Sequence, residues 1–269
     1  MTFRFRMPVL RLPVLRRPLR SVLPNSEPAY CAPVDPDPDP GFPHDGDIVL
    51  SVDDASVSRD GITLLPPTSL TVAAGECVAV RGENGAGKTT LLRVLAGRLR
   101  PTGGSAALAG RTVDERCPEV RRAIAALIDP PALYPDLTVA GHLEFIVAAW
   151  APFDERNEPE TADPSAGLTA RQSAIEAALR AFGLSPLRDR FPDELSSGQR
   201  QLVALAVTFA RPARVILLDE PEQRLDPDRL ALLEAEIRRA SERGISVVFA
   251  SHSTALVAAV AHRSVRVAA

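Results

Sequence analysis

The most informative scarcity in this 269-residue sequence is that of lysine. Of the 31 lysine and arginine side chains, only Lys88 is a lysine, so one position keeps a compact ammonium where every other basic position has a guanidinium. An ammonium acts as a point charge in phosphate pockets, whereas the planar guanidinium favours bidentate contacts. Lys88 is therefore a candidate phosphate ligand before any motif is considered.

The sequence also lacks the features of several protein classes. No run approaches the roughly 18 to 20 uninterrupted apolar residues that cross a bilayer, so we expect no membrane span. Cys31, Cys77 and Cys117 have no paired spacing, which suits a reducing compartment and excludes a zinc site or a disulfide framework. The formal net charge of -3 gives no global attraction for nucleic acid, so no nucleic-acid partner is expected.

The first 46 residues differ in composition from the rest. Arginine and proline dominate their beginning, and an Asp-Pro repeat covers residues 35–40. Such a segment buries too little apolar surface to offset its ordering entropy, so we expect disorder over residues 1–46. It could be an extension without function, a start codon assigned too early, or a contact for anionic lipid head groups.

From residue 47 the sequence changes to short apolar and β-branched runs. Runs at 48–52 and 69–72 predict an opening antiparallel β layer. A short apolar strand at 76–80 precedes a glycine-rich turn, and helical spacing follows over 89–99. The order strand, glycine turn, helix is typical of phosphate binding.

The second half of the sequence predicts a mainly parallel sheet covered on both faces, because buried runs alternate with helical patterns. The predicted strands are 214–218, 246–250 and 264–267. The predicted helices are 139–150, 170–182 and 227–243, with a polar linker at 154–167. We expect one α/β domain over 47–269, with its catalytic core at about 47–128 and 191–269 and an inserted helical subdomain at about 129–190.

The glycine-rich turn satisfies the phosphate-loop pattern, which predicts a P-loop NTPase core. Its residues are Gly82, Glu83, Asn84, Gly85, Ala86, Gly87, Lys88 and Thr89, and we add Thr90 to the predicted nucleotide site. Glycine lets the backbone wrap phosphates, so that N–H groups and the positive helix end point at them. Lys88 is expected to reach the β and γ phosphates, and Thr89 to offer its hydroxyl to Mg²⁺.

Two carboxylates end a buried run later in the sequence. Asp219 and Glu220 follow the predicted strand 214–218, at the edge where open α/β sheets bind ligands. Asp219 is expected to hold Mg²⁺ through water, and Glu220 to polarise the attacking water. The alternative is that the two acids cap the next helix or face solvent.

The segment Leu195-Ser196-Ser197-Gly198-Gln199-Arg200-Gln201 resembles the signature sequence of the ATP-binding cassette (ABC) proteins. From its residues alone, it is either an anion-binding helix terminus or an ordinary N-cap. In that family two subunits face head to tail, and the motif of one subunit closes on the γ phosphate held by the other. The resemblance, over about residues 47–269, implies these roles for Ser196, Gly198 and Gln199.

Two further elements match the family. Leu225-Asp226 matches the loop that couples the two sites across the dimer, although Gln223 and Arg224 replace the usual small residues. The resemblance places Asp226 in the nucleotide site. His252 matches the switch histidine, which senses the γ phosphate and helps to position the attacking water.

Two positions depart from the family pattern. The aromatic residue that normally stacks on adenine falls near Arg59, whose planar guanidinium could stack on a base instead. The glutamine that normally links Mg²⁺ to the transporter contact is replaced by Asp129. Asp129 is a candidate metal ligand or a turn residue before Pro130-Pro131, and because some export cassettes carry an acid there, export is slightly favoured over import.

The resemblance implies an ATPase with ATP and Mg²⁺ as cofactors, which powers a separately encoded membrane permease. It also implies a second ABC subunit, as a homodimer, and a cytoplasmic protein peripheral to the inner face of the cell membrane. Two alternatives stay open. One is a non-transport cassette acting on ribosomes or DNA, and the other is a degenerate regulatory cassette, suggested by Arg59, Asp129 and the altered coupling loop.

Overall fold

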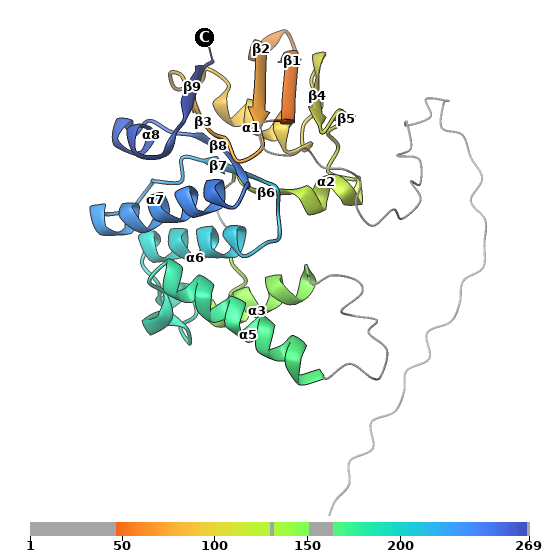
Figure 1. Cartoon of the computed structure of the whole chain (residues 1–269). Helices are drawn as coiled ribbons and strands as arrows, with labels where there is room; N and C mark the ends of the chain where they lie inside the picture. Colours follow the sequence, from red (N-terminus) through yellow and green to blue (C-terminus); the bar gives the residue numbers. More distant parts are fainter. Residues whose placement is uncertain (1–46, 130–131, 151–163, 268–269) are drawn as a thin grey trace, which may run out of the picture. The chain divides into compact units, whose positions relative to one another are not determined.

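The computed structural model of this chain describes residues 47–129, 132–150 and 164–267. The segment predicted to be disordered, residues 1–46, lies outside the described residues. Strands of the described part form two sheets, with helices packed against them (Figure 1). The α/β class predicted from the sequence is confirmed.

An antiparallel sheet of four strands, in the order β2-β1-β4-β5, opens the described chain. Its strands are β1 (Ile48–Arg59), β2 (Ile62–Ala73), β4 (Gly103–Leu108) and β5 (Arg111–Thr112). The predicted opening β layer is confirmed, but β1 and β2 are longer than the predicted runs. Pro66 and Pro67 hid the length of β2, and that strand tolerates them because it lies at the edge of the sheet.

A parallel sheet of five strands, in the order β6-β7-β8-β3-β9, carries the predicted site. Its strands are β3 (Cys77–Arg81), β6 (Ile124–Leu127), β7 (Val215–Asp219), β8 (Ser246–Ala250) and β9 (Arg263–Arg266). The predicted mainly parallel sheet is confirmed. Strand β6 was not predicted, because its four residues include two alanines, which favour helix over strand.

Helices cover both faces of the parallel sheet. They are α1 (Lys88–Leu95), α2 (Pro118–Ala123), α3 (Val139–Ala149), α5 (Pro164–Ala181), α6 (Ser197–Phe209), α7 (Pro227–Glu242) and α8 (Thr254–Val260), with 3₁₀ turns at η1 (Ser185–Leu187) and η2 (Pro192–Glu194). Helix α1 ends before the predicted residue 99, where Gly97 has a φ of 71°. Helix α5 starts earlier than predicted, so it includes the end of the segment predicted as a linker; residues 154–163 lie outside the described residues.

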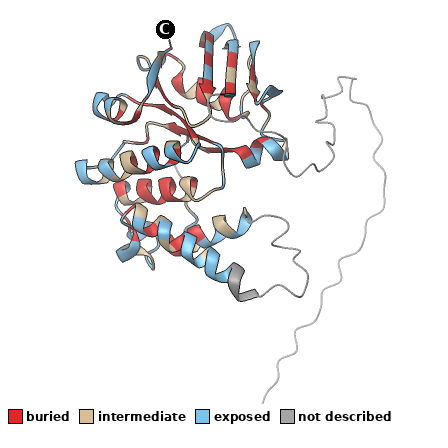
Figure 2. Cartoon of the chain, viewed as in Figure 1, coloured by how far each residue is buried: buried red, intermediate tan, exposed pale blue. Residues whose placement is uncertain are grey.

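The central strands β3, β7 and β8 are buried on both faces (Figure 2). Successive side chains of a strand point to opposite faces. In β7, Val215 and Leu217 pack in the core that contains α1 and the antiparallel sheet, whereas Ile216 and Leu218 pack in the core under α6, α7 and α8. The strands therefore read as continuous apolar runs, as the sequence indicated.

Helices α3 and α5 contact each other and helix α6 (Figure 1). Leu143 of α3 and Leu179 of α5 are fully buried in the core on the α6 face. The exact limits of the helical subdomain, 129–190, stay a prediction. Of the helices that are described, none combines the length and apolar character needed to cross a bilayer.

Candidate functional site

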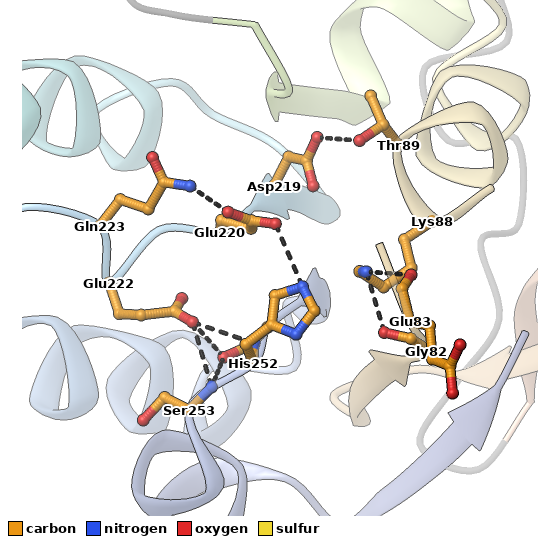
Figure 3. A network of polar contacts seen from close by, with 11 residues as sticks. Gly82, Glu83, Lys88, Thr89, Asp219, Glu220, Glu222, Gln223, His252 and Ser253 are labelled. Atoms are coloured by element: carbon orange, nitrogen blue, oxygen red, sulfur yellow. Dashed lines mark hydrogen bonds and ion pairs between the residues drawn. The ribbon is translucent and has the colours of Figure 1, made fainter. Parts of the chain in front are cut away.

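Three loops leave the carboxyl edge of the parallel sheet side by side. The phosphate loop (residues 82–89) follows β3, the switch loop (251–253) follows β8, and the coupling loop (220–226) follows β7. Because β8 lies between β7 and β3, the switch loop leaves the sheet between the other two. Figure 3 shows polar side chains from all three loops facing one another.

The Lys88 side chain lies inside the phosphate loop. It is only 6% exposed, and its ammonium donates to the carbonyl oxygens of Gly82 at 3.0 Å and Glu83 at 2.9 Å. These two carbonyls hold the ammonium within the loop (Figure 3). The one lysine of the sequence is thus positioned as a compact cation at the start of a helix.

Gly87 makes the loop geometry possible. Its φ of 100° belongs to the left-handed region that favours glycine, and a Cβ there would lie 2.6 Å from the Leu64 carbonyl oxygen of β2. Gly87 is also the N-cap of α1, and as a glycine it offers no side chain to the N–H groups of that helix end. Those N–H groups are therefore open to an anion.

Thr89 and Asp219 join the phosphate loop to the end of β7. The Thr89 hydroxyl donates to Asp219 Oδ2 at 2.6 Å. Asp219 Oδ1 is buried and has no hydrogen-bond partner among the described residues. Burial raises the pKa of Asp219, and the Glu220 charge adds to this effect, whereas the Thr89 hydrogen bond opposes it.

These residues fit a magnesium ion. A buried, unpaired carboxylate oxygen beside a hydroxyl supplies the hard oxygen ligands that Mg²⁺ prefers, and a cation would offset the cost of burying the carboxylate. No group of three or more His, Cys, Asp or Glu side chains that could hold a metal was found in the part of the chain that the structure describes. The donor set matches an ion that is held by one carboxylate and by substrate phosphates.

Glu220 and His252 lie together at the centre of the site. Glu220 Oε1 is 3.4 Å from His252 Nε2 (Figure 3). Glu220 has a φ of 46°, an unusual value for a residue other than glycine, and its backbone N–H donates to the Ala250 carbonyl at 2.9 Å. The strained turn ends β7 and directs the carboxylate toward the switch loop.

Sequence reasoning missed two polar contacts of the coupling loop. The side-chain amide of Gln223 donates to Glu220 Oε2. Glu222 Oε1 accepts from the Ser251 hydroxyl at 2.5 Å and from the backbone N–H groups of His252 at 3.2 Å and Ser253 at 3.3 Å. The signal available for Gln223 was a long polar side chain where the family has a small residue, whereas no such signal in the sequence pointed to the Glu222 contacts.

The predicted signature residues form the start of α6. Ser196 is the N-cap, and its hydroxyl accepts from the Gln199 backbone N–H at 3.2 Å while the Gln199 side chain accepts from the Ser196 N–H at 2.8 Å. A Cβ on Gly198 would lie 2.5 Å from the Arg224 carbonyl oxygen. Within the described residues no hydrogen bond or ion pair joins these three residues to the phosphate loop of the same chain.

Asp226 has a helix-capping role in this chain. Its carboxylate accepts from the Arg229 backbone N–H at 2.9 Å and caps α7. Gln201, at the end of the signature sequence, donates through Nε2 to the Pro221 carbonyl at 3.3 Å. The coupling loop is therefore held by α6 on one side and ends in the N-cap of α7 on the other.

A cavity of about 760 Å³ opens beside the phosphate loop. It is lined by Asn84, Gly85, Gly87, Lys88, Thr89, Thr90, Glu220 and His252, and by Ile62, Thr63 and Leu64 of β2. Arg59 is not among the lining residues; its side chain is 82% exposed and pairs with Asp60 at 3.8 Å. The geometry therefore gives no support to base stacking by Arg59.

Asp129 pairs with two arginines. Its Oδ1 accepts from Arg93 of α1 at 2.7 Å, and its Oδ2 lies 3.6 Å from Arg98. Both carboxylate oxygens thus have cationic partners. A metal role for Asp129 stays a prediction, whereas Asp219 has a buried oxygen without a hydrogen-bond partner among the described residues.

A family model described as "ABC transporter" matches residues 65–223. This match covers more than half of the chain. The chain belongs to the ABC transporter family. The cassette contains the phosphate loop, the two carboxylates and the capped signature helix in the order that the resemblance predicted, and the expected fold is confirmed.

Named relatives of the cassette are import proteins. It is 39% identical over 195 residues to the sn-glycerol-3-phosphate import ATP-binding protein UgpC of Chromohalobacter salexigens, covering 72% of this chain and 48% of the relative. It is 37% identical over 203 residues to the thiamine import ATP-binding protein ThiQ of Escherichia coli, covering 74% of this chain and 80% of the relative. The cassette therefore spans about half the length of UgpC.

A solved structure described as an ATP-binding subunit of an ABC transporter has a similar fold. Its TM-score is 0.69 at 26% identity, covering 81% of this chain and 85% of that chain. The names of UgpC and ThiQ do not support the slight preference for export that was based on Asp129.

Proposed function

We propose that this chain is the ATP-binding and ATP-hydrolysing subunit of an ABC transporter. The observation that carries the proposal is that one cavity is lined by Lys88 and Thr89, with Asp219 bonded to Thr89, and also by the paired Glu220 and His252. One group of residues suits a triphosphate with its cation, and the other suits a water molecule. Phosphoryl transfer needs such positioning and charge stabilisation more than covalent help.

Each residue has a distinct part in the proposed reaction. Lys88 and the open N–H groups of α1 bind phosphate oxygens. Thr89 and Asp219 hold Mg²⁺, which when bound neutralises charge on the phosphates. Glu220 orients and polarises the attacking water, and His252 fixes the position of the Glu220 carboxylate from the switch loop.

Hydrolysis is proposed to need two cassettes. Ser196, Gly198 and Gln199 have no hydrogen bond or ion pair to the phosphate loop of their own chain among the described residues, so in the proposal they complete the site of a second subunit. A homodimer is the simplest arrangement. The partner that uses the work is a separately encoded membrane permease, which places the cassette at the inner face of the cell membrane.

We propose import as the direction of transport. Support comes from the relatives UgpC and ThiQ, both named as import ATP-binding proteins. The proposal names no transported molecule, because the cassette is proposed to bind the nucleotide and not the solute. Uptake of solute by vesicles containing the recovered permease tests the direction, and ATP-driven release would overturn it.

The substitution Glu220→Gln tests the proposed function. It keeps the side-chain shape and removes the charge, so turnover should fall by about a hundredfold or more, since an acid–base group contributes about 10²- to 10⁴-fold. An ATP-bound dimer should accumulate, as measured by sedimentation with and without Mg·ATP. Glu242→Gln, at the exposed end of α7, is the control and should behave like the wild type.

Three results would redirect the proposal. Full turnover by the Glu220→Gln variant would remove Glu220 from its role. No ATP hydrolysis by the wild type, alone or with its permease, would favour a regulatory cassette. Salt-sensitive co-purification with RNA or DNA in place of a membrane protein would favour a non-transport cassette.

A further inference from the structure

The switch loop is held by a side chain that is not part of it. One oxygen of Glu222, in the coupling loop, accepts from the Ser251 hydroxyl, the His252 N–H and the Ser253 N–H at 2.5, 3.2 and 3.3 Å (Figure 3). The Ser253 N–H also donates to the Ser251 hydroxyl at 2.9 Å. Every residue of the switch loop thus donates to one carboxylate oxygen.

The contacts are partly protected from water. Ser251 is 2% exposed, and the second oxygen of Glu222 is buried without a hydrogen-bond partner among the described residues. A carboxylate that accepts several hydrogen bonds away from water binds its donors more strongly than a neutral acceptor. The backbone of His252 is therefore fixed from the coupling-loop side, while its exposed ring stays free to contact Glu220.

Gln223, the residue after Glu222, contacts Glu220, which is the acid that lies beside His252. The Gln223 side chain donates to Glu220 Oε2, and His252 Nε2 lies 3.4 Å from Glu220 Oε1. Glu222 and Gln223 thus fix the two ends of the Glu220–His252 contact (Figure 3). Glu222 makes the better-buried contacts, because Gln223 is exposed.

We infer that Glu222 is a positioning residue for the proposed hydrolysis: it holds the switch loop so that His252 stays within reach of Glu220. This inference rests on the proposed function. Within the described residues Glu222 has no hydrogen bond or ion pair to the phosphate loop, so we expect its effect to pass through His252. Replacing it should lower kcat with little change in the affinity for Mg·ATP.

The test compares Glu222→Ala with Glu222→Gln. The alanine variant removes the acceptor and should lower kcat by about tenfold or more, as expected for the loss of hydrogen bonds to a charged group. The glutamine variant keeps an acceptor oxygen in the same place and should retain most of the turnover. The dissociation constant for Mg·ATP should change less than about threefold in both, because the phosphate-loop contacts remain.

A matched control separates positioning from a general loss of stability. Glu76 is also a partly buried carboxylate that accepts from a backbone N–H, that of Ala73 at 2.9 Å, but it precedes β3 and lies at the opposite edge of the sheet. Glu76→Ala should lower the midpoint of thermal unfolding without lowering kcat. Equal losses of kcat in Glu76→Ala and Glu222→Ala would overturn the inference.

A double-mutant cycle locates the effect. In a His252→Ala background, Glu222→Ala should reduce kcat by less than about twofold further, because coupled residues give non-additive effects. Fully additive losses would show that Glu222 acts elsewhere and would overturn the inference.

Amide hydrogen exchange gives a readout that does not depend on ATP hydrolysis. The amides of His252 and Ser253 should exchange about tenfold faster in Glu222→Ala and near the wild-type rate in Glu222→Gln. Unchanged exchange in the alanine variant would overturn the inference. Faster exchange in a chain whose wild type hydrolyses no ATP would keep the positioning role of Glu222 and refute the proposed function alone.

Discussion

Helices α1 and α6 begin in different ways, although each is proposed to contact a triphosphate, α1 that of its own chain and α6 that of a second subunit. The N-cap of α1 is Gly87, which has no side chain to cap the helix, and among the described residues the Lys88 ammonium bonds to loop carbonyls. The N-cap of α6 is Ser196, whose reciprocal hydrogen bonds with Gln199 cap the helix end. One helix end is open to an anion, and the other is already capped.

The difference separates two tasks. An uncapped helix end with a buried cation has N–H groups that a bound anion can satisfy, so α1 suits the phosphate site of its own chain. A capped end is stable by itself and can still offer its remaining N–H groups and its hydroxyl to an approaching anion. Helix α6 therefore suits a surface that meets the nucleotide of another subunit only when two cassettes close.

Removing the charge at the uncapped end of α1 should have the greatest effect. Lys88→Met removes the charge with little change in length, so Mg·ATP affinity should fall by about a hundredfold, as expected for the loss of charge-assisted bonds. Isothermal titration calorimetry measures it. Lys88→Arg is the control of equal charge, and it should recover only part of the affinity because a planar guanidinium does not fit the two-carbonyl contact. Wild-type affinity in Lys88→Met would contradict this assignment.

The second effect concerns the close approach of α6 to the coupling loop. Gly198→Ala would place a Cβ 2.5 Å from the Arg224 carbonyl, so the loop must move; we expect a loss of about 1–3 kcal/mol in stability and a turnover loss of about tenfold. Gly141→Ala, also in the first turn of a helix, meets the Thr138 hydroxyl at 3.3 Å and is the control, which should cost little. Thermal unfolding and ATPase assays measure both. Equal behaviour of the two variants would contradict the coupling of α6 to this loop.

Removing single N-cap hydroxyls should have a smaller effect, and it tests whether the start of α6 contacts a second subunit. Ser196→Ala and Thr138→Ala each remove one N-cap hydrogen bond, and each should cost about 1 kcal/mol of stability. Only Ser196→Ala should weaken ATP-driven dimerisation, by about fivefold, with unchanged ATP affinity of the monomer. Sedimentation of both variants in the Glu220→Gln background measures this. Equal dimerisation of the two variants would show that the Ser196 hydroxyl makes no contact across the dimer.

Much of the fold was predictable because the central strands are buried on both faces. Their continuous apolar runs, such as Val247-Val248-Phe249, identify strands without regard to the rest of the chain. Strand β6 and the full length of β2 were not predictable, because alanine and proline hide a strand whose existence depends on pairing. Tertiary pairing decided those segments.

The candidate site was predictable where backbone geometry requires particular residues. Gly87 and Lys88 could be identified because few other residues satisfy a left-handed turn that is followed by a buried ammonium. The contacts of Glu222 and the pairing of Asp129 with Arg93 could not be predicted, since they depend on which side chains meet across separate loops. Sequence order gives no distance between such loops.

The strand order fixes the width of the site. Adjacent strands lie about 4.8 Å apart, so the loops that follow β7 and β3, on either side of β8, start about 10 Å apart. This gap comes from backbone hydrogen bonding and not from any side chain in the loops. Exchanging apolar residues within the strands should therefore leave the gap unchanged, and variation in the loops can alter chemistry without altering the space in which it occurs.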